Sequence, residues 1–266
     1  DITNALQGRL AGVSIMSSSG QPGSSATIRV RGSNSLASES GPLIVIDGLM
    51  GGSLSSLNPS DIASVEVLKD ASATAIYGSK GSAGVILITT KNPESGKVNV
   101  EYNGYINFKT PYELPEMMSA GQFAELANDY VNEINASTGS SMSEFYTPEQ
   151  IQEFYQNGGY DYIDKVFRNM SIEHTHELSI SGGSEKTKFL FSGSYNDNQG
   201  IVNNSWGKRF NYRLKVDTDI RKWLKVGLNF WGDYQKSSSI RFSQYNNLLI
   251  GALTYPNTLS PTDENG

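Results

Sequence analysis

The sequence of 266 residues has no cysteine, no long apolar run and no excess of basic residues. Without cysteine, the chain can form no disulfide framework, Fe–S cluster or cysteine-based zinc site. Its 21 basic and 27 acidic side chains give a net charge of −6, whereas nucleic-acid-binding domains normally carry a basic surface, so we expect no nucleic-acid partner. A helix that crosses a membrane needs about 18–20 consecutive apolar residues, and the longest apolar runs, 43–46 and 85–88, have four. The sequence therefore predicts no membrane-spanning helix.

Aromatic residues are almost missing from one part of the chain. Residues 1–96 contain a single one, Tyr77, and all the others lie in 97–266. The change coincides with Asn-Pro and Ser-Gly pairs at 92–96, which are typical of breaks between elements. We therefore predict two domains, 1–96 and 97–266. The 27 glycines and the charged fraction of only 18% favour a β-rich chain with many turns.

Short apolar segments separated by turn residues predict a small α/β module in the first domain. Residues 26–31 alternate with period two, so Ile28 and Val30 share one strand face, and Arg29 and Arg31 share the other. With a single aromatic residue, this module cannot build a large core, so we expect it to need surrounding structure for stability. The other expected elements are strands at 43–46, 64–68 and 85–90 and short helices at 4–10 and 71–77, the second with Gly78 as its C-cap.

Six sequence motifs follow one another in order over this module. They are LQGRLAGV (6–13), IRVRG (28–32), PLIVIDG (42–48), NPSDI (58–62), VEVLKDA (65–71), and AIYG with GVILITTK (75–78 and 84–91). Together they resemble the plug domain of TonB-dependent outer-membrane transporters. The stretch LKDASATAIYG (68–78) resembles the SusC/RagA branch in particular, because other branches usually carry Gly where this chain has Asp70.

The resemblance implies structural or gating roles for a set of plug residues. Two arginines on one face of a small domain need carboxylate partners if they are buried. In a plug, Arg29 and Arg31 would face acidic residues of the barrel wall and lock the plug in place. The alternative is that both arginines are solvated. The full plug set is Arg29, Arg31, Gly32, Asp47, Gly48, Glu66, Lys69, Asp70, Tyr77, Gly78 and Gly84.

The second domain contains long segments that alternate between apolar and polar residues. Their length approaches the 9–11 residues with which a tilted strand crosses a bilayer, and this alternation is typical of outer-membrane barrels. The alternative is a soluble β-sandwich, whose strands also alternate but are usually shorter. We therefore predict an α+β plug domain followed by about five antiparallel transmembrane strands of an incomplete β-barrel. The expected strands are 98–108, 172–182, 189–196, 210–220 and 224–234.

Short and long connections alternate between these strands. The connections at 182–186 and 219–223 are short, whereas 109–171, 197–206 and 235–266 are longer. Outer-membrane barrels have short periplasmic turns and longer extracellular loops, so the long connections are expected outside the cell and the plug on the periplasmic side.

The longest of these connections is expected to contain two helices. A capping box begins at Ser119, and Pro148 follows Thr147 at the first position of the second helix. In the same loop, Tyr160 and Tyr162 are candidate ligand-binding residues that could stack on a sugar ring. The alternative is that they pack loops together.

His174 and His176 are the only histidines, and period two places them on the same strand face. A metal site would need a third ligand from elsewhere. A Ser-His-Asp triad would have to use one of them, and no Gly-x-Ser-x-Gly elbow lies nearby. We interpret both as interfacial polar side chains at a strand end and expect no metal, no cofactor and no catalytic residue.

The resemblance also implies a function. A SusC-like transporter would import a nutrient, a glycan or oligosaccharide in the first instance, across the outer membrane of a Gram-negative cell of the Bacteroidota. Its strands would contact outer-membrane lipid, a SusD-like surface lipoprotein would act as a lid, and the inner-membrane TonB complex would remodel the plug. Alternatives are a peptide importer of the same branch and a signalling or binding outer-membrane receptor. Because the chain starts at Asp1 and five strands cannot close a barrel, we expect a fragment of a longer transporter.

Overall fold

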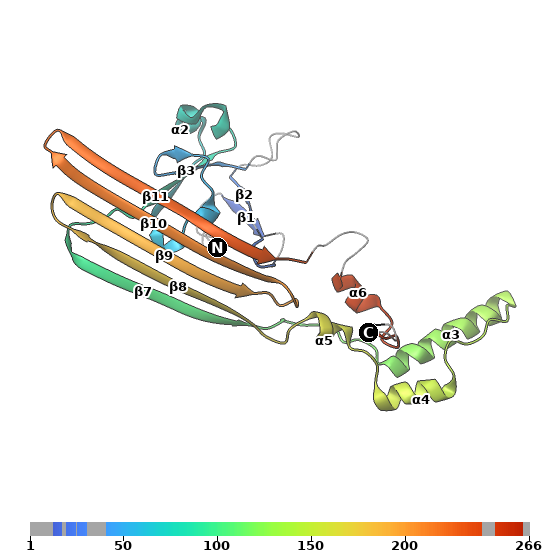
Figure 1. Ribbon diagram of the computed structural model, residues 1–266. Coiled ribbons are helices and arrows are strands. Elements are labelled where there is room, and N and C mark those ends of the chain that lie inside the picture. Colours follow the sequence, from blue (N-terminus) through green and yellow to red (C-terminus); the bar gives the residue numbers. More distant parts are fainter. Residues whose placement is uncertain (1–12, 18–19, 25, 31–40, 241–247, 263–266) are drawn as a thin grey trace. The chain divides into compact units, whose positions relative to one another are not determined.

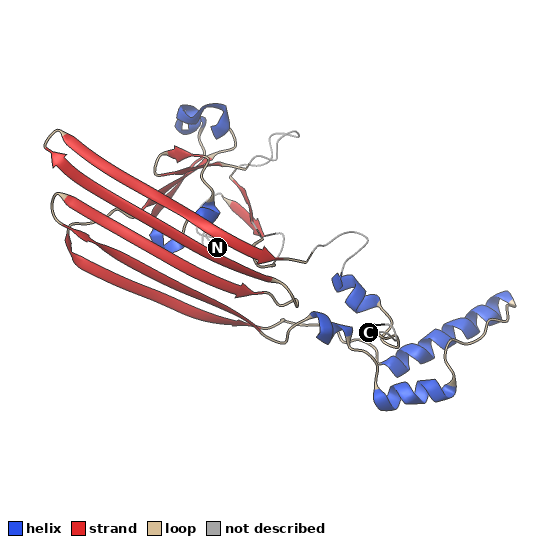
Figure 2. Ribbon diagram, in the orientation of Figure 1, coloured by secondary structure: helices blue, strands red, loops and turns tan. Residues whose placement is uncertain are grey.

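The computed structural model describes the chain except for residues 1–12, 18–19, 25, 31–40, 241–247 and 263–266 (Figure 1). The helix expected at 4–10 therefore lies outside the described residues. The chain forms two compact units, which are described separately: the first comprises Asp1–Asn107, Ile172–Gly200 and Ser205–Ser239, and the second comprises Phe108–Ser171, Ile201–Asn204 and Ile240–Gly266. Nearly all strand residues lie in the first unit, and the longer helices lie in the second (Figure 2).

The N-terminal module consists of β1 to β6 with their connections. Its main sheet has the strand order β4-β3-β6-β5, in which β3 and β6 are parallel and the other pairs antiparallel. A second, two-stranded sheet joins β1 to β2. The strands expected at 43–46 and 85–90 are confirmed, because continuous apolar runs bounded by Pro, Gly and Asp define both. The strands are β1 (Ser14–Ser17), β2 (Ala26–Arg29), β3 (Leu43–Ile46), β4 (Leu49–Met50), β5 (Ile62–Leu68) and β6 (Val85–Thr90).

The helical segments of the module are short. Two single 3₁₀ turns, η1 (Leu54–Ser56) and η2 (Pro59–Asp61), follow β4. In place of the one helix expected at 71–77, an α-helical turn, α2 (Ala71–Thr74), runs into the 3₁₀ segment η3 (Ala75–Gly81). The predicted C-cap at Gly78 is wrong, because α2 ends at Thr74. Gly78 lies inside η3 with φ 61° and ψ −151°, a conformation that glycine adopts without a steric penalty.

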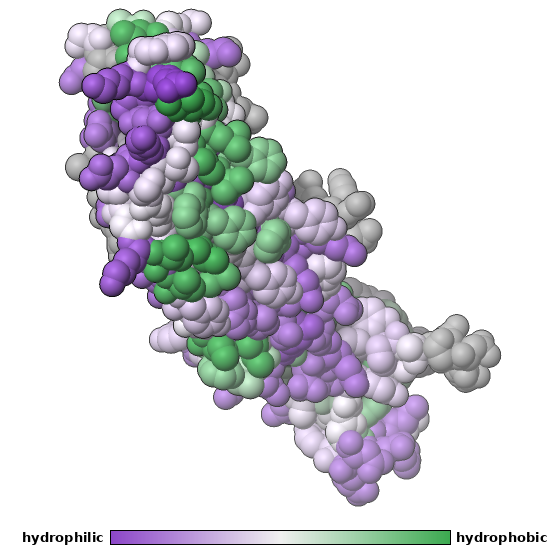
Figure 3. Space-filling model, turned by 60° about the vertical axis from the view of Figure 1, so that its left-hand side comes forward, coloured by the Kyte–Doolittle hydropathy of each residue, from purple (hydrophilic) through white to green (hydrophobic). Residues whose placement is uncertain are grey.

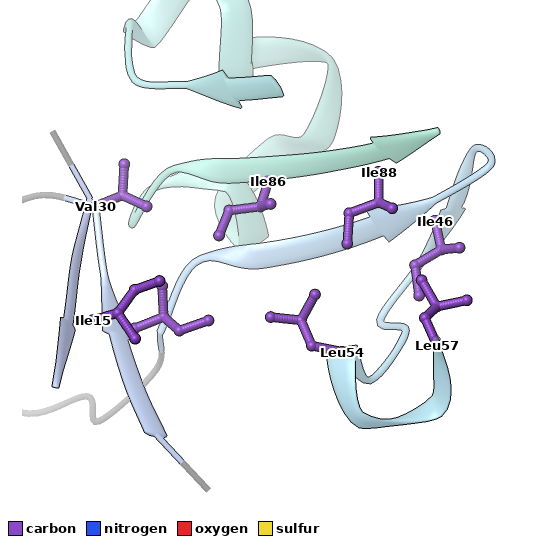
Figure 4. Close-up of a cluster of buried hydrophobic side chains, with 8 residues drawn as sticks. Ile15, Val30, Ile46, Leu54, Leu57, Ile86 and Ile88 are labelled. Carbon is purple, nitrogen blue, oxygen red and sulfur yellow. The ribbon is translucent and has the colours of Figure 1, made fainter. Parts of the chain in front are cut away.

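The core of the module is aliphatic. Trp231 from β11 (Leu224–Ser238), outside the module, packs against it. A tryptophan buries a large apolar area, so it supplies contact area that the aromatic-poor module lacks. Whether the module depends on surrounding structure for its stability stays a prediction. The buried side chains are Ile15, Ile28, Val30, Ile46, Leu54, Leu57, Ile86 and Ile88 (Figure 4).

Five long strands form a third sheet, which is antiparallel and which we call the wall. Its order is β11-β10-β9-β8-β7, so each strand pairs with its neighbours in sequence. All five predicted strands are confirmed and are longer than expected at one or both ends. The register pairs Leu214 with Phe191 on one side and with Phe230 on the other. The strands are β7 (Gly96–Lys109), β8 (Ser171–Gly183), β9 (Thr187–Gln199), β10 (Trp206–Arg221) and β11 (Leu224–Ser238).

The two faces of the wall have different surroundings. Side chains of one parity, including Arg213 and Trp231, contact the N-terminal module, and we call this the inward face. Side chains of the other parity form the outward face, where Phe230 is 55% exposed and Leu228 53% exposed. Figure 3 shows hydrophobic residues gathered along the middle of the visible face, with hydrophilic residues both above and below them. The middle of the outward face is thus apolar although it is exposed.

The second unit is built around a helical hairpin. Both expected helices are confirmed as α3 (Ala120–Thr138) and α4 (Pro148–Asn157), each opened by a full capping box at Ser119 and Thr147. Two shorter helices, α5 (Tyr162–Val166) and α6 (Leu248–Thr254), complete the unit. None of the described helices combines the length and the apolar character needed to cross a membrane.

Candidate functional site

A buried polar cluster joins the N-terminal module to the inward face of the wall. Asp47 directly follows β3 and adopts φ 48°, a left-handed conformation that Asp tolerates better than most residues. Its Oδ1 accepts a hydrogen bond of 2.9 Å from the backbone N–H of Thr90, and its Oδ2 accepts one from the Thr90 hydroxyl. Asn229 of β11 donates its Nδ2 to the Asp47 Oδ2 at 2.8 Å. The carboxylate of the turn after β3 is therefore held from two strands of different sheets.

Arg213 of β10 is the cation of this cluster and is only 2% exposed. Its Nη2 lies 3.5 Å from Asp47 Oδ2 and donates to the Thr90 hydroxyl, and its Nε donates to Asn229 Oδ1 at 3.4 Å. Within the described part of the chain, Nη1 has no hydrogen-bond partner. A buried guanidinium is tolerated only when carboxylates and hydrogen bonds compensate its lost hydration, so the contact to Asp47 is a requirement of the fold.

Asp61, at the end of η2, provides a second carboxylate that interacts with Arg213. The two acids differ in their protonation. Burial acts to raise the pKa of Asp47, but the hydrogen bonds from Thr90 and Asn229 outweigh it and hold this pKa below its ordinary value. Burial raises the pKa of Asp61, and the positive charges of Arg213 and Lys91 offset it only in part. Asp47 is therefore the ionised partner of Arg213, and Asp61 takes up a proton first as the pH falls. We call Arg213, Asp47, Asp61, Thr90 and Asn229 the Arg213 cluster.

Two further contacts flank the Arg213 cluster. Lys215, two residues along β10 on the same face, donates its Nζ to Asn92 Oδ1. At the other end of the wall, the connection between β1 and β2 approaches Gly207 so closely that a Cβ there would lie 3.2 Å from Cβ of Pro22. The inward face of β10 therefore contacts the module at three levels.

The plug residues predicted from sequence are distributed over the module. Asp47 and Gly48 form the turn that enters the Arg213 cluster. Gly84 has φ 97°, and a Cβ there would lie 2.8 Å from the Val30 Cγ1, so the position requires glycine. The remaining described members lie elsewhere on the module and not in this cluster; these are Glu66, Lys69, Asp70, Tyr77 and Gly78.

The sequence predicted that arginines of the module pair with acidic residues of the wall, and the structure contains an ion pair in which these roles are exchanged. Arg29 is exposed on β2, and Arg31 and Gly32 lie outside the described residues. Their pairing with acidic wall residues therefore stays a prediction. In the Arg213 cluster the module supplies the acid and the wall supplies the arginine. Sequence reasoning missed Arg213, although its place on the polar parity of a spanning strand was a usable signal.

A cleft of about 820 Å³ in the second unit contains both candidate ligand-binding tyrosines. Tyr162 donates its hydroxyl to the Leu259 carbonyl at 2.7 Å and packs edge-to-face on Tyr255 with ring centroids 5.3 Å apart. The backbone N–H of Tyr160 donates to the Asn257 carbonyl at 2.8 Å. Asn257 Oδ1 is buried without a hydrogen-bond partner among the described residues. The lining therefore combines aromatic surface with an unused acceptor.

The charged residues that line this cleft are both acidic. They are Glu116 and Asp161, and apolar lining comes from Met117, Met118 and Phe123. Such a lining suits a ligand with hydrogen-bond donors and an apolar face, such as a sugar ring or a peptide side chain.

Comparisons with known proteins agree with this architecture. Residues 1–85 match the family described as TonB-dependent receptor plug domain. TonB-dependent receptor P3 of Formosa agariphila is 40% identical over 229 residues, which are 86% of this chain and 21% of that protein. TonB-dependent receptor SusC of Bacteroides thetaiotaomicron is 38% identical over 222 residues, which are 78% of this chain and 20% of SusC.

Solved structures show the same fold. A chain from the structure of the RagAB peptide transporter superposes on 100% of this chain with a TM-score of 0.79 at 28% identity, and 32% of that chain is covered. The chain spans about a fifth of the length of the curated relatives it matches. The plug match, the relatives and the unclosed antiparallel wall together show that the chain belongs to the SusC/RagA type of TonB-dependent receptors.

Proposed function

We propose that the protein containing this chain imports a nutrient across the outer membrane in a TonB-dependent manner. The Arg213 cluster carries this proposal, because it fixes the plug to the inward face of the wall through buried charged and polar groups. Buried ion pairs and hydrogen bonds of this kind are either formed or broken, and breaking them leaves buried charges without a partner. A pull on the plug therefore has to disrupt a defined set of bonds before a path along the wall opens. The relatives are receptors and transporters, so we infer transport and not catalysis.

The imported nutrient is proposed to be a glycan or oligosaccharide. The resemblance to the SusC branch supports this class, and the aromatic cleft with Tyr160 and Tyr162 offers a surface on which a sugar ring could stack. A peptide is the second candidate, and the similarity to the RagAB peptide transporter favours it.

The proposal includes partners and a location. A SusD-like lipoprotein would cover the outer end of the transporter, and the inner-membrane TonB complex would act on the plug. The location would be the outer membrane of a member of the Bacteroidota, in keeping with relatives in Formosa and Bacteroides. The long connections, including the helical unit, would then lie outside the cell.

Tethering the plug tests whether its movement is required. The chain has no native cysteine, so Pro22→Cys with Gly207→Cys introduces one defined pair at near-disulfide spacing between plug and wall. The matched control, Thr187→Cys with Thr218→Cys, crosslinks two directly opposed wall residues and leaves the plug free. In the full-length protein, oxidation is expected to stop TonB-dependent uptake only in the first variant, and a reductant is expected to restore it. Uptake at the wild-type rate with complete plug crosslinking would contradict the proposal.

The substrate class is tested by uptake in cells. Cells with and without the full-length gene receive labelled oligosaccharides and labelled peptides of similar mass. Gene-dependent and TonB-dependent uptake of the oligosaccharides alone is expected. Uptake of the peptides alone would show that the imported nutrient is a peptide and not a glycan. Uptake that requires neither the full-length gene nor TonB would overturn the import function.

A further inference from the structure

The outward face of the wall is ordered into rows of directly opposed side chains. Two residues along each strand separate one row from the next, which corresponds to about 7 Å. One row is charged and polar, and consists of His174, Asp197, Lys208 and Lys236 on β8 to β11. The next row is aromatic, and consists of His176, Tyr195, Phe210 and Tyr234. A further row, four residues beyond the aromatic row toward the middle of the strands, is apolar and includes Ile180, Phe191, Leu214 and Phe230.

This order is the one expected where lipid tails meet headgroups. Aromatic girdles mark the interface of outer-membrane strands, with apolar residues on one side and polar residues on the other. Tyr234 is 67% exposed in the aromatic row, and Phe230 is 55% exposed in the apolar one. The charged row lies at the end of the wall that carries the long connections, which is the outer end in the proposed orientation. It is therefore placed at the level of the outer headgroups.

The charged row contains two neighbouring lysines whose positive charges repel each other. Lys208 and Lys236 are direct cross-strand neighbours, and like charges in this position are destabilising. Asp197 lies 2.9 Å from Lys208 Nζ and compensates one lysine. Lys236 Nζ lies over the ring of Trp206, 6.0 Å from its centroid, and no carboxylate in the described part of the chain forms an ion pair with it. The ammonium group of Lys236 thus has no carboxylate partner among the described residues, at the height where lipid headgroups are expected.

A polar atom without a partner lies in the same row. His174 Nδ1 is buried and has no hydrogen-bond partner among the described residues. Its neighbours belong to an aromatic group: the ring of His174 lies 5.2 Å from that of His176 and 6.1 Å from that of Tyr195. His176 in turn shares a hydrogen bond of 2.6 Å with the Tyr102 hydroxyl. The two histidines therefore lie in adjacent rows near one end of β8.

We propose that Lys208 and Lys236 of the charged row bind the phosphate of a lipid headgroup in the outer leaflet. The phosphate would accept hydrogen bonds from the two ammonium groups and remove their repulsion. The acyl chains of the same lipid would lie along the aromatic and apolar rows, and this continuity favours a lipid over free phosphate. The inference rests on the outer-membrane location and not on which nutrient is imported.

Lipid binding by the purified full-length protein tests this site. The protein is delipidated in a non-ionic detergent, and native mass spectrometry then measures binding of monophosphoryl lipid A and of the same lipid without its phosphate. Because a basic residue near an anionic membrane surface contributes about 1 kcal/mol, the phosphorylated lipid is expected to bind about fivefold better. The double variant Lys208→Gln with Lys236→Gln is expected to lose this preference.

The matched control removes two lysines from the short turns at the opposite end, Lys186→Gln with Lys222→Gln. It is expected to keep the preference, because these exposed lysines are outside the row. Heat-dependent gel mobility confirms that each variant is folded, and outer-membrane fractionation tests the location separately. Equal binding of both lipids, or an unchanged preference in the Lys208 and Lys236 variant, would overturn the proposal. Displacement of the lipid by inorganic phosphate at equal concentration would overturn the lipid assignment.

Discussion

The inward and outward faces of the wall come from the same five strands and follow opposite rules. On the inward face, the charged Arg213 is buried to 2% exposure, and its partners come from the plug. On the outward face, Phe230 and Leu228 are about half exposed and have no described cover. Soluble proteins place such residues the other way round. The difference teaches that period-two alternation separates two environments across one sheet, a polar contact with the plug and an exposed apolar surface.

Removing the buried cation of the inward face should have the largest effect on stability. Arg213→Met leaves the carboxylates of Asp47 and Asp61 buried without their cation. Loss of one partner of a buried pair costs about 3–5 kcal/mol, so the plug of the full-length protein should unfold or become protease-sensitive at much lower denaturant concentration. Limited proteolysis across a urea series measures this.

A double variant provides the control for Arg213. In Arg213→Met with Asp47→Asn, both charges of the pair are absent, so the loss should be smaller than the sum of the two single losses. Additive losses would show that the two side chains are not coupled.

The next prediction places a charge on the opposite face. Leu214→Lys, adjacent to Arg213 but on the outward face, introduces an ammonium group into the apolar row. Near the bilayer midplane this should cost about 2–4 kcal/mol in the free energy of unfolding from phosphatidylcholine vesicles. Tyr234→Lys, in the aromatic row, should cost about 0–1 kcal/mol by the same measure. Equal costs at the two positions would contradict the assignment of the rows.

Sequence reasoning predicted those features whose signals are local. The wall strands follow from alternation within about a dozen residues, and the helices α3 and α4 follow from capping boxes at Ser119 and Thr147. The plug was identified because six motifs occur in order. The Gly78 cap was predicted wrongly because α2 runs into 3₁₀ turns, a change that residue type alone does not indicate.

The Arg213 cluster could not be predicted in the same way. Its bonds join Arg213 to Thr90 across 123 residues and Asn229 to Asp47 across 182 residues. Alternation places Arg213 and Asn229 on the polar face, but the partner of each depends on how the plug sheet meets the wall. The domain boundary at 96 stays a prediction for a related reason, since plug and wall strands belong to one compact unit.

The two acids on the inward face predict opposite effects of pH. The pKa of Asp47 is depressed in the folded protein, so its contribution is present above its unfolded pKa and is lost as the pH falls through the folded value. The pKa of Asp61 is raised, so its protonated form favours folding, and that gain is lost as the pH rises through the folded value.

Substitutions separate these two contributions. Asp61→Asn should modestly increase the free energy of unfolding at neutral pH, and Asp47→Asn should decrease it there and weaken its dependence on pH in the acid range. Chemical unfolding of the full-length protein between neutral and acid pH measures both. A decrease at neutral pH for both variants would contradict the difference between the two acids.

The smallest effect is expected at the rim of the inward face. Lys215 lies two residues from Arg213 and donates to Asn92, but this contact is exposed to solvent. Lys215→Gln removes a cation that water can replace, so it should cost about 0.5–1 kcal/mol or less, several-fold below the Arg213→Met loss. Added salt should reduce the Lys215 effect and leave the Arg213 effect nearly unchanged, because exposed charges are screened and buried ones are not. If both losses were equal or equally sensitive to salt, burial by the plug would not be what distinguishes Arg213 from its neighbour on the same face.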